Sequence, residues 1–346
     1  MDEIKINFIA DGYNYLNTNC VDNSIAWGCG CFRKEFYYFY CFYYCLQANW
    51  NTIDINNFST HANTIMKPMG LYLKTIKIFD FNAFKEAVCH NIELGLPVFF
   101  PTVCKECFYL IEAHRESNTN GHYIFITGFD HETGVFFISD SAINRQNMLQ
   151  YYNSQPIIQI ALREKDMYDI FESTKEYFKN EDNDYLNSLV VIKKLTIKLN
   201  KQMTGFIDIF YDLIDNYNYL NNNLVTAINQ IYDDINILKF EKNIAFLRSS
   251  HIFSFNVFFD CFEKAFEKLL DDISLKSKYE ILKKKYINSK DLLLSKLLKI
   301  SLSNRRVLES QKKDMIEGVL QYDKSLFDFV KYCIKKYEEQ FLKQKI

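Results

Sequence analysis

The chain has 346 residues, a length that suits two domains and a sizeable hydrophobic core. Hydrophobic residues make up 48% of it and aromatic residues 16%, a composition that excludes an intrinsically disordered chain. The formal net charge of -2 indicates no nucleic-acid partner, and the longest uncharged apolar run, 36–49, is too short to span a membrane.

The distribution of turn-forming residues predicts two domains. All four prolines lie at or before Pro156, and eight of the ten glycines lie at or before Gly134. The loss of these residues predicts long helices in the rest of the chain. We therefore expect an α+β domain over residues 1–165, followed by an all-α helical domain over residues 166–346.

The first domain is predicted to pack helices against an antiparallel sheet. Apolar residues at helical spacing predict one helix that begins at Cys20 and others over 34–47 and 81–92. Alternating or continuous apolar runs predict strands at 70–78, 98–103, 122–129, 135–139 and 156–162. The segment 130–134 has the composition of a hairpin turn, so the strands on either side of it are expected to pair antiparallel.

Two apolar stripes at helical spacing predict the helices of the second domain. One stripe covers 258–273, and the other covers 326–341 after a capping residue at Ser325. A short β-rich run, 190–195, is expected to return to the sheet of the first domain.

Cys20 lies where a thiol is easily ionised. It follows capping side chains at 17–19 and begins a predicted helix. The unpaired N–H groups and the positive end of the dipole at a helix N-terminus stabilise a thiolate. The same N–H groups can hold a developing oxyanion. Cys20 is therefore a candidate nucleophile, and a buried inert thiol is the alternative.

His122 and Asp140 are candidates for the base and its orienting carboxylate. If the strands around 130–134 pair antiparallel, His122 lies opposite about residue 142, which places Asp140 beside it at the same rim of the sheet. An aspartate there can hold the Nδ1–H of the imidazole and fix its tautomer. An ordinary strand-edge histidine and a turn aspartate are the alternative.

The order of these motifs resembles that of the papain-like C39 peptidase superfamily. A cysteine at a helix start is followed by Gly-His-Tyr at a strand start, 121–123, and by Ser-Asp at the end of the next strand, 139–140. The chain is similar in particular to the butirosin-type branch found in antibiotic and nonribosomal peptide clusters. In that branch Asn-Cys opens the helix, an aromatic segment follows, and the histidine strand ends in Gly-Tyr-Asp, which here is Gly-Phe-Asp at 128–130. The resemblance covers about residues 10–165 and implies a papain-like fold.

The resemblance also implies roles for individual residues. Cys20 would be the nucleophile, His122 the base and Asp140 the orienting carboxylate. Papain-like enzymes place a glutamine six residues before the cysteine to line the oxyanion hole. That position is Asn14 here, and Asn17 and Asn19 are competing candidates.

Two alternatives involve other cysteines. The run 29–32, Cys-Gly-Cys-Phe, resembles the papain segment around its nucleophile and would make Cys31 the attacking thiol. Cys29 and Cys31 are also candidates, together with Cys104 and Cys107, for the four thiolates of a zinc site. We rank both interpretations below Cys20 and expect no metal.

The butirosin-type resemblance implies acyl transfer. An acyl or peptidyl group would move from a carrier-protein thioester to Cys20 and then to a small amine or diamine, which forms an amide without ATP. The alternative is a cysteine peptidase of the C39-like type. No bound cofactor is expected, since the substrate arrives on the phosphopantetheine arm of an acyl or peptidyl carrier protein.

The segment 276–313 is strongly basic, with twelve lysines and arginines against three carboxylates. A solvated helix face is one interpretation, and a docking surface for an acidic partner such as a carrier protein is the other. No nucleic-acid-binding motif accompanies this segment. The acidic start of the sequence lacks the apolar segment of a signal peptide. We therefore expect a cytoplasmic protein with reduced thiols and with neither a nucleic-acid nor a membrane partner.

Overall fold

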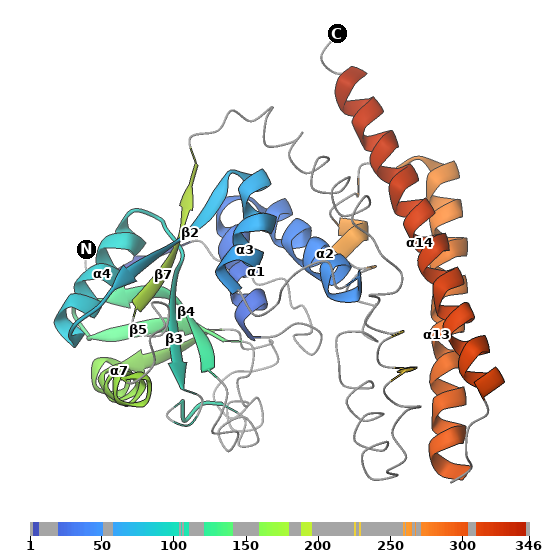
Figure 1. The fold of residues 1–346 in the computed structure, drawn as a ribbon. Coiled ribbons are helices and arrows are strands. Elements are labelled where there is room, and N and C mark those ends of the chain that lie inside the picture. Colours follow the sequence, from blue (N-terminus) through green and yellow to red (C-terminus); the bar gives the residue numbers. More distant parts are fainter. Residues whose placement is uncertain are drawn as a thin grey trace, which may run out of the picture. The chain divides into compact units, whose positions relative to one another are not determined.

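The computed structural model divides the chain into two compact units (Figure 1). The first consists of Met1–Tyr40 and Phe58–Lys198, and the second of Cys41–Asn57 and Leu199–Ile346. The structure describes residues 3–6, 20–50, 58–110 except 104 and 106, 121–140, 159–179, 188–195, 271–303 and 309–343, with isolated positions between 225 and 267.

The described elements follow one another in this order: β1 (Glu3–Lys5), α1 (Cys20–Phe32), α2 (Lys34–Trp50), α3 (Phe58–Met66), a 3-10 turn η2 (Lys67–Met69), β2 (Leu71–Lys77), α4 (Phe81–Glu93), β3 (Val98–Val103), β4 (Gly121–Asp130), β5 (Val135–Ser139), β6 (Gln159–Arg163), α7 (Glu164–Phe178), β7 (Ser188–Lys194), α13 (Ile273–Ser303) and α14 (Glu309–Lys343). The first unit is therefore the α+β fold that the sequence predicts.

The strands of the first unit form one antiparallel sheet in the order β2-β7-β3-β4-β5-β6. The N-terminal strand β1 pairs with the last residues of β4, where Ile4 lies opposite Phe129. The predicted hairpin is confirmed, since β4 and β5 are antiparallel neighbours joined by a turn that ends at Gly134 with a positive φ of 63°. A left-handed backbone there favours glycine.

The boundary predicted near residue 165 falls inside the first unit, which extends to Lys198. The strand expected at 190–195 is β7, and it lies between β2 and β3 rather than at an edge of the sheet. Its residues 188–192 are all buried. A strand that completes the middle of a sheet cannot belong to another domain, and α7, which leads to it, stays with the first unit as well.

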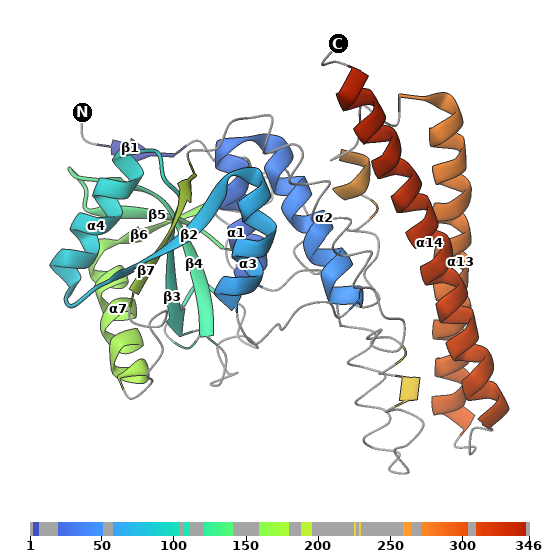
Figure 2. The ribbon, with the colours of Figure 1, turned by 45° about the horizontal axis from the view of Figure 1, so that its top comes forward.

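Helices cover both faces of this sheet (Figure 2). On one face, Phe84 of α4 contacts Phe100 of β3 and Phe171 of α7, with ring centroids 4.9 and 5.3 Å apart. On the other face, α1 packs so closely that a Cβ on Gly28 would lie 2.5 Å from Cζ of Phe99. Trp27 of the same helix lies 6.4 Å from the ring of Phe125 in β4. The core of the unit is therefore two aromatic-rich layers, one on each side of the sheet.

The described part of the second unit is dominated by the long antiparallel helices α13 and α14, which lie side by side (Figures 1 and 2). The last part of α2 also belongs to this unit, where Phe42 lies 5.6 Å from the ring of Phe262. The capping role predicted for Ser325 is wrong. Helix α14 begins at Glu309, and the Ser325 hydroxyl donates a hydrogen bond back to the carbonyl of Gln321 within it. None of the described helices is long and apolar enough to cross a membrane.

Candidate active site

The antiparallel pairing of β4 and β5 brings His122 and Asp140 together. Phe125 lies opposite Ser139 and Ile126 opposite Ile138, which is the register that the sequence predicts. His122 is the second residue of β4, and Asp140 directly follows the last residue of β5. Their side chains meet at this end of the sheet, with 2.6 Å between Nε2 of the imidazole and Oδ2 of the carboxylate.

Both partners of this pair are removed from solvent. His122 is 3% exposed and Asp140 is 1% exposed. A hydrogen bond between an imidazole and a buried carboxylate is stronger than one in water, because the surrounding protein screens it less. The pair is therefore a fixed unit rather than a transient surface contact.

The imidazole nitrogen that contacts Asp140 differs from the one predicted from the sequence. The expected partner was Nδ1, but the carboxylate contacts Nε2. Nδ1 lies next to the point where the ring joins the side chain, whereas Nε2 is at the far edge and reaches the neighbouring strand. A proton held on Nε2 by Asp140 makes Nδ1 the basic nitrogen of the neutral ring.

A tyrosine that the sequence reasoning missed completes the cluster. The hydroxyl of Tyr109 donates a hydrogen bond to the same oxygen of Asp140, Oδ2, over 3.0 Å. Burial, together with the nearby Cys107 and Asp140, raises the pKa of Tyr109 well above its ordinary value of 10.0. Tyr109 follows a strand by only a few residues, but no spacing rule links it to the end of β5, so no sequence signal indicated it.

The helix that carries Cys20 begins where the sequence predicts. Helix α1 starts at Cys20, and Asp22 in its first turn is buried and accepts a hydrogen bond of 2.7 Å from the hydroxyl of Tyr40 in α2. This contact ties the first turn of α1 to α2. The thiol of Cys20 and the oxyanion candidates Asn14 and Asn19 lie outside the part of the chain that the structure describes, so their roles stay predictions.

Strand register decides which face of the sheet carries the His122–Asp140 pair. Residues opposite each other in neighbouring strands point to the same face. His122 lies opposite Thr102, whose hydroxyl is 2.8 Å from that of Thr174 in α7. Helix α1 covers the other face, through Trp27 and Phe125. The His122–Asp140 pair and the body of α1 therefore lie on opposite faces of the sheet.

Cys31, the second candidate nucleophile, is poorly suited to that role. Its thiol lies in the last turn of α1 and donates to the carbonyl of Trp27 over 3.4 Å. Burial raises its pKa from 9.0 to about 12. A thiol with so high a pKa is almost fully protonated near neutral pH, and the protonated form is a weak nucleophile.

The four-cysteine zinc site finds no support among the described residues. Cys29 is fully buried within α1, and the thiol of Cys107 faces the carbonyl of Val103 at 3.6 Å. Cys104 lies outside the described residues. Among the described positions, no group of three or more histidine, cysteine, aspartate or glutamate side chains is arranged to hold a metal ion.

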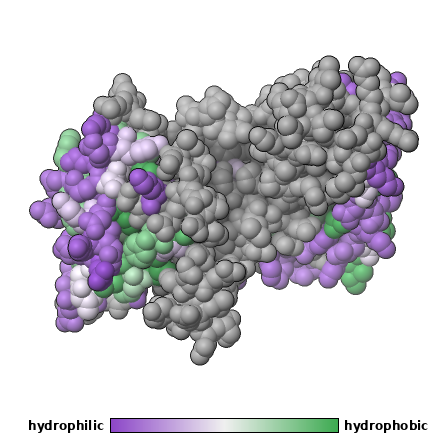
Figure 3. Space-filling view, turned by 90° about the horizontal axis from the view of Figure 1, so that it is seen from below, coloured by the Kyte–Doolittle hydropathy of each residue, from purple (hydrophilic) through white to green (hydrophobic). Residues whose placement is uncertain are grey.

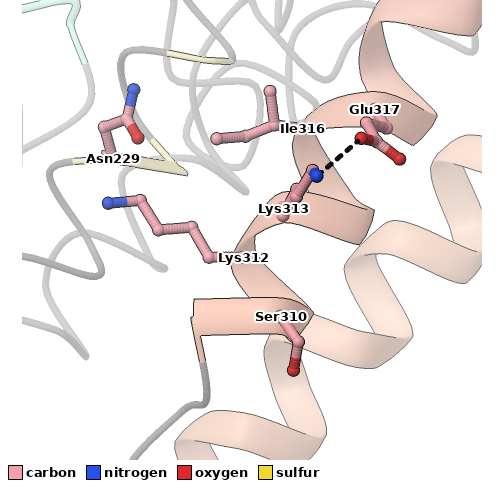
Figure 4. A pocket seen from close by; sticks show the side chains of 6 residues that line it. All are labelled: Asn229, Ser310, Lys312, Lys313, Ile316 and Glu317. Atoms are coloured by element: carbon pink, nitrogen blue, oxygen red, sulfur yellow. Dashed lines mark ion pairs between the residues drawn. The ribbon is translucent and has the colours of Figure 1, made fainter.

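The second unit contains a separate hollow of about 450 Å³ at the start of α14 (Figure 4). It is lined by Asn229, Ser310, Lys312, Lys313, Ile316 and Glu317. The ammonium of Lys313 pairs with the carboxylate of Glu317 over 3.9 Å. The described lining residues include neither a thiol nor an imidazole, so they do not indicate nucleophilic acyl chemistry.

Comparison with known proteins gives one family match. The model of the Peptidase_C39 like family matches residues 38–168. No curated protein matches the chain at a significant level. The matched segment includes His122 and Asp140 but begins after Cys20. This match supports the assignment of the sheet-bearing unit to a papain-like, C39-like superfamily. In this unit, His122 and Asp140 lie at the ends of the neighbouring strands β4 and β5.

Proposed function

We propose that this protein is a cysteine-dependent acyltransferase that forms amides from carrier-bound thioesters. Cys20 is the nucleophile, His122 the general base and Asp140 its orienting carboxylate. The observation that supports this proposal most directly is the buried hydrogen bond of 2.6 Å between His122 and Asp140. Such a pair at strand ends, in a segment similar to C39-like peptidases, suits proton transfer to and from a nucleophilic thiol.

The first step acylates the enzyme. Nδ1 of His122 accepts the proton of the Cys20 thiol, and the thiolate attacks the thioester carbonyl. A carbon–sulfur bond forms to Cys20 as the bond to the phosphopantetheine sulfur breaks. The imidazolium returns its proton to the departing pantetheine thiolate, which leaves an acyl-cysteine and a free carrier thiol.

The second step transfers the acyl group to a small amine or diamine. The amine nitrogen attacks the acyl-cysteine carbonyl, and His122 accepts the proton that the nitrogen loses. The Cys20 sulfur leaves and recovers a proton from the imidazolium. Thioester and amine thus become amide and thiol without ATP, since the thioester is already activated. In its narrowest form, this proposal makes the chain a counterpart of the amide-forming protein of closthioamide assembly, a likeness that rests on the sequence resemblance alone.

The helix start at Cys20 supports the nucleophile assignment. The first turn of α1 lies at the positive end of the helix dipole, which favours a thiolate and a tetrahedral oxyanion. Asn14 and Asn19 are proposed to add a donor to the same oxyanion.

An exposed face of α13 suits an acidic carrier protein. Ile281, Lys284, Lys285 and Leu292 are exposed on one side of the helix, opposite the buried Tyr279. The same face continues with exposed lysines at positions 296 and 299. On the face seen in Figure 3, the described surface of α13 and α14 is mostly hydrophilic, with scattered hydrophobic residues. Lysines around two apolar side chains match the chemistry of an acidic helix with an apolar stripe.

A second candidate, a cysteine peptidase, is favoured by the family match itself. It would use the same three side chains, with a peptide carbonyl as acyl donor and water as acceptor. The two candidates differ only in donor and acceptor, so substrates distinguish them.

Intact-protein mass spectrometry tests the proposal. The chain is mixed with acyl-loaded carrier protein, and the bound mass is located by peptide mapping. We expect an increase equal to the acyl group on Cys20, discharged as amide by added amine, and no increase in Cys20→Ala. Release of free acid with cleavage of peptides would favour the peptidase. No adduct with either class of substrate would contradict both.

A further inference from the structure

We propose that Tyr109 is a positioning residue that holds Asp140 in place for His122. This inference rests on the proposed function, since it concerns the base of that reaction. Two donors converge on one carboxylate oxygen: the imidazole Nε2 of His122 at 2.6 Å and the hydroxyl of Tyr109 at 3.0 Å. Tyr109 thus acts on the base through the aspartate.

The surroundings of the hydroxyl explain why it is a dependable donor. Tyr109 is 4% exposed, so water does not compete for its hydrogen bond. Burial keeps its pKa well above 10.0, so the hydroxyl stays protonated at any working pH. Cys107 lies beside the hydroxyl and is itself anchored to the carbonyl of Val103 at the end of β3.

This arrangement controls the direction of the imidazole. Asp140 lies one residue beyond Ser139, the last residue of β5 that pairs with β4. The hydroxyl of Tyr109 restricts rotation of the carboxylate, and the carboxylate in turn restricts rotation of the imidazole. Without the hydroxyl, the ring samples a wider range of orientations, fewer of which suit proton transfer at Nδ1, and proton transfer slows.

The reactivity of Cys20 toward iodoacetamide tests this inference without a substrate. Alkylation is measured over time by peptide mapping, because the chain has ten cysteines. The variants are Tyr109→Phe, His122→Ala, Asp140→Asn and the double variant Tyr109→Phe/Asp140→Asn. All are assayed well below their unfolding transitions. We expect Tyr109→Phe to slow alkylation of Cys20 about tenfold, the loss of one hydrogen bond to a charged group.

The double variant separates positioning from a general structural role. If Tyr109 acts through the carboxylate, Tyr109→Phe adds no further slowing once Asp140 is asparagine. The matched control is Tyr279→Phe in the second unit, where a buried tyrosine also donates to a carboxylate, that of Glu263, over 2.8 Å. This control should lower thermal stability and leave Cys20 reactivity unchanged.

The outcomes distinguish this inference from the proposed function. If wild-type Cys20 reacts no faster than a free thiol and His122→Ala changes nothing, both are overturned. If wild-type Cys20 is activated and His122→Ala slows it, while Tyr109→Phe leaves the rate unchanged, only the role of Tyr109 is overturned. Additive slowing in the double variant also overturns it.

Discussion

Each unit contains a cluster in which a tyrosine hydroxyl and a basic side chain contact one carboxylate oxygen. In the first, Tyr109 and His122 converge on Oδ2 of Asp140. In the second, Tyr279 and Lys283 converge on Oε1 of Glu263. Each cluster joins a phenol, a carboxylate and a basic nitrogen, so the difference in role has to come from the base and from burial.

The base and its exposure separate the two clusters. The side chains of His122 and Asp140 are 3% and 0% exposed, whereas those of Lys283 and Glu263 are 24% and 35% exposed. An imidazole gains and loses a proton near neutral pH, but an ammonium keeps its charge. The first cluster can therefore transfer protons, and the second stabilises local packing only. Solvent screening also makes the second a weak contact.

The largest expected effect comes from removing the nucleophile that would make the first cluster catalytic. Cys20→Ala should abolish acyl transfer while the protein keeps its fold, because an alanine side chain cannot form the acyl-enzyme. Turnover and circular dichroism are measured together. Activity retained in the folded variant would contradict Cys20 as the nucleophile.

A smaller but still large effect is expected for the carboxylates. Asp140→Asn should slow turnover about 10³–10⁴-fold, because an asparagine no longer favours the productive tautomer. Glu263→Gln should leave turnover unchanged and lower the free energy of unfolding by about 1 kcal/mol. Turnover and thermal unfolding are measured for both variants. An equal loss of turnover in the two would contradict the different roles given to Asp140 and Glu263.

Buried protonated groups in the first unit should make the free energy of unfolding depend on pH in the alkaline range. Burial raises the pKa of Tyr109 well above 10.0 and that of Cys31 from 9.0 to about 12. The folded protein therefore keeps protons that the unfolded chain releases above these ordinary values, and stability falls as pH rises through them. The fall between pH 9 and 12 should be shallower in Tyr109→Phe and in Cys31→Ala, measured by urea unfolding. An unchanged slope would contradict the burial of these groups.

The smallest expected effect concerns the lysines of α13. The double change Lys284→Glu/Lys285→Glu should weaken carrier binding several-fold, mostly through slower association, and leave acylation by a small thioester unchanged. Lys283→Glu is the matched control, since Lys283 already pairs with Glu263 and its loss should lower stability instead. Binding is followed at two salt concentrations. Equal loss of binding in both variants would count against this docking face.

Local pattern was enough to predict much of the first unit. Apolar β-rich runs predicted β3, β4 and β5, and the turn at 130–134 set the register of β4 and β5, which placed Asp140 beside His122. Capping chemistry predicted that α1 begins at Cys20. These features depend on neighbours in the sequence, and short-range periodicity carries them.

Only the tertiary structure decided the features that depend on distant segments. It placed β7 between β2 and β3 and so moved the boundary of the first unit to Lys198. It brought Tyr109 to Asp140 and selected Nε2 as the nitrogen that the carboxylate holds. The reason is physical: periodicity records which side of an element is buried, whereas the partner that buries it is chosen by packing across the whole unit.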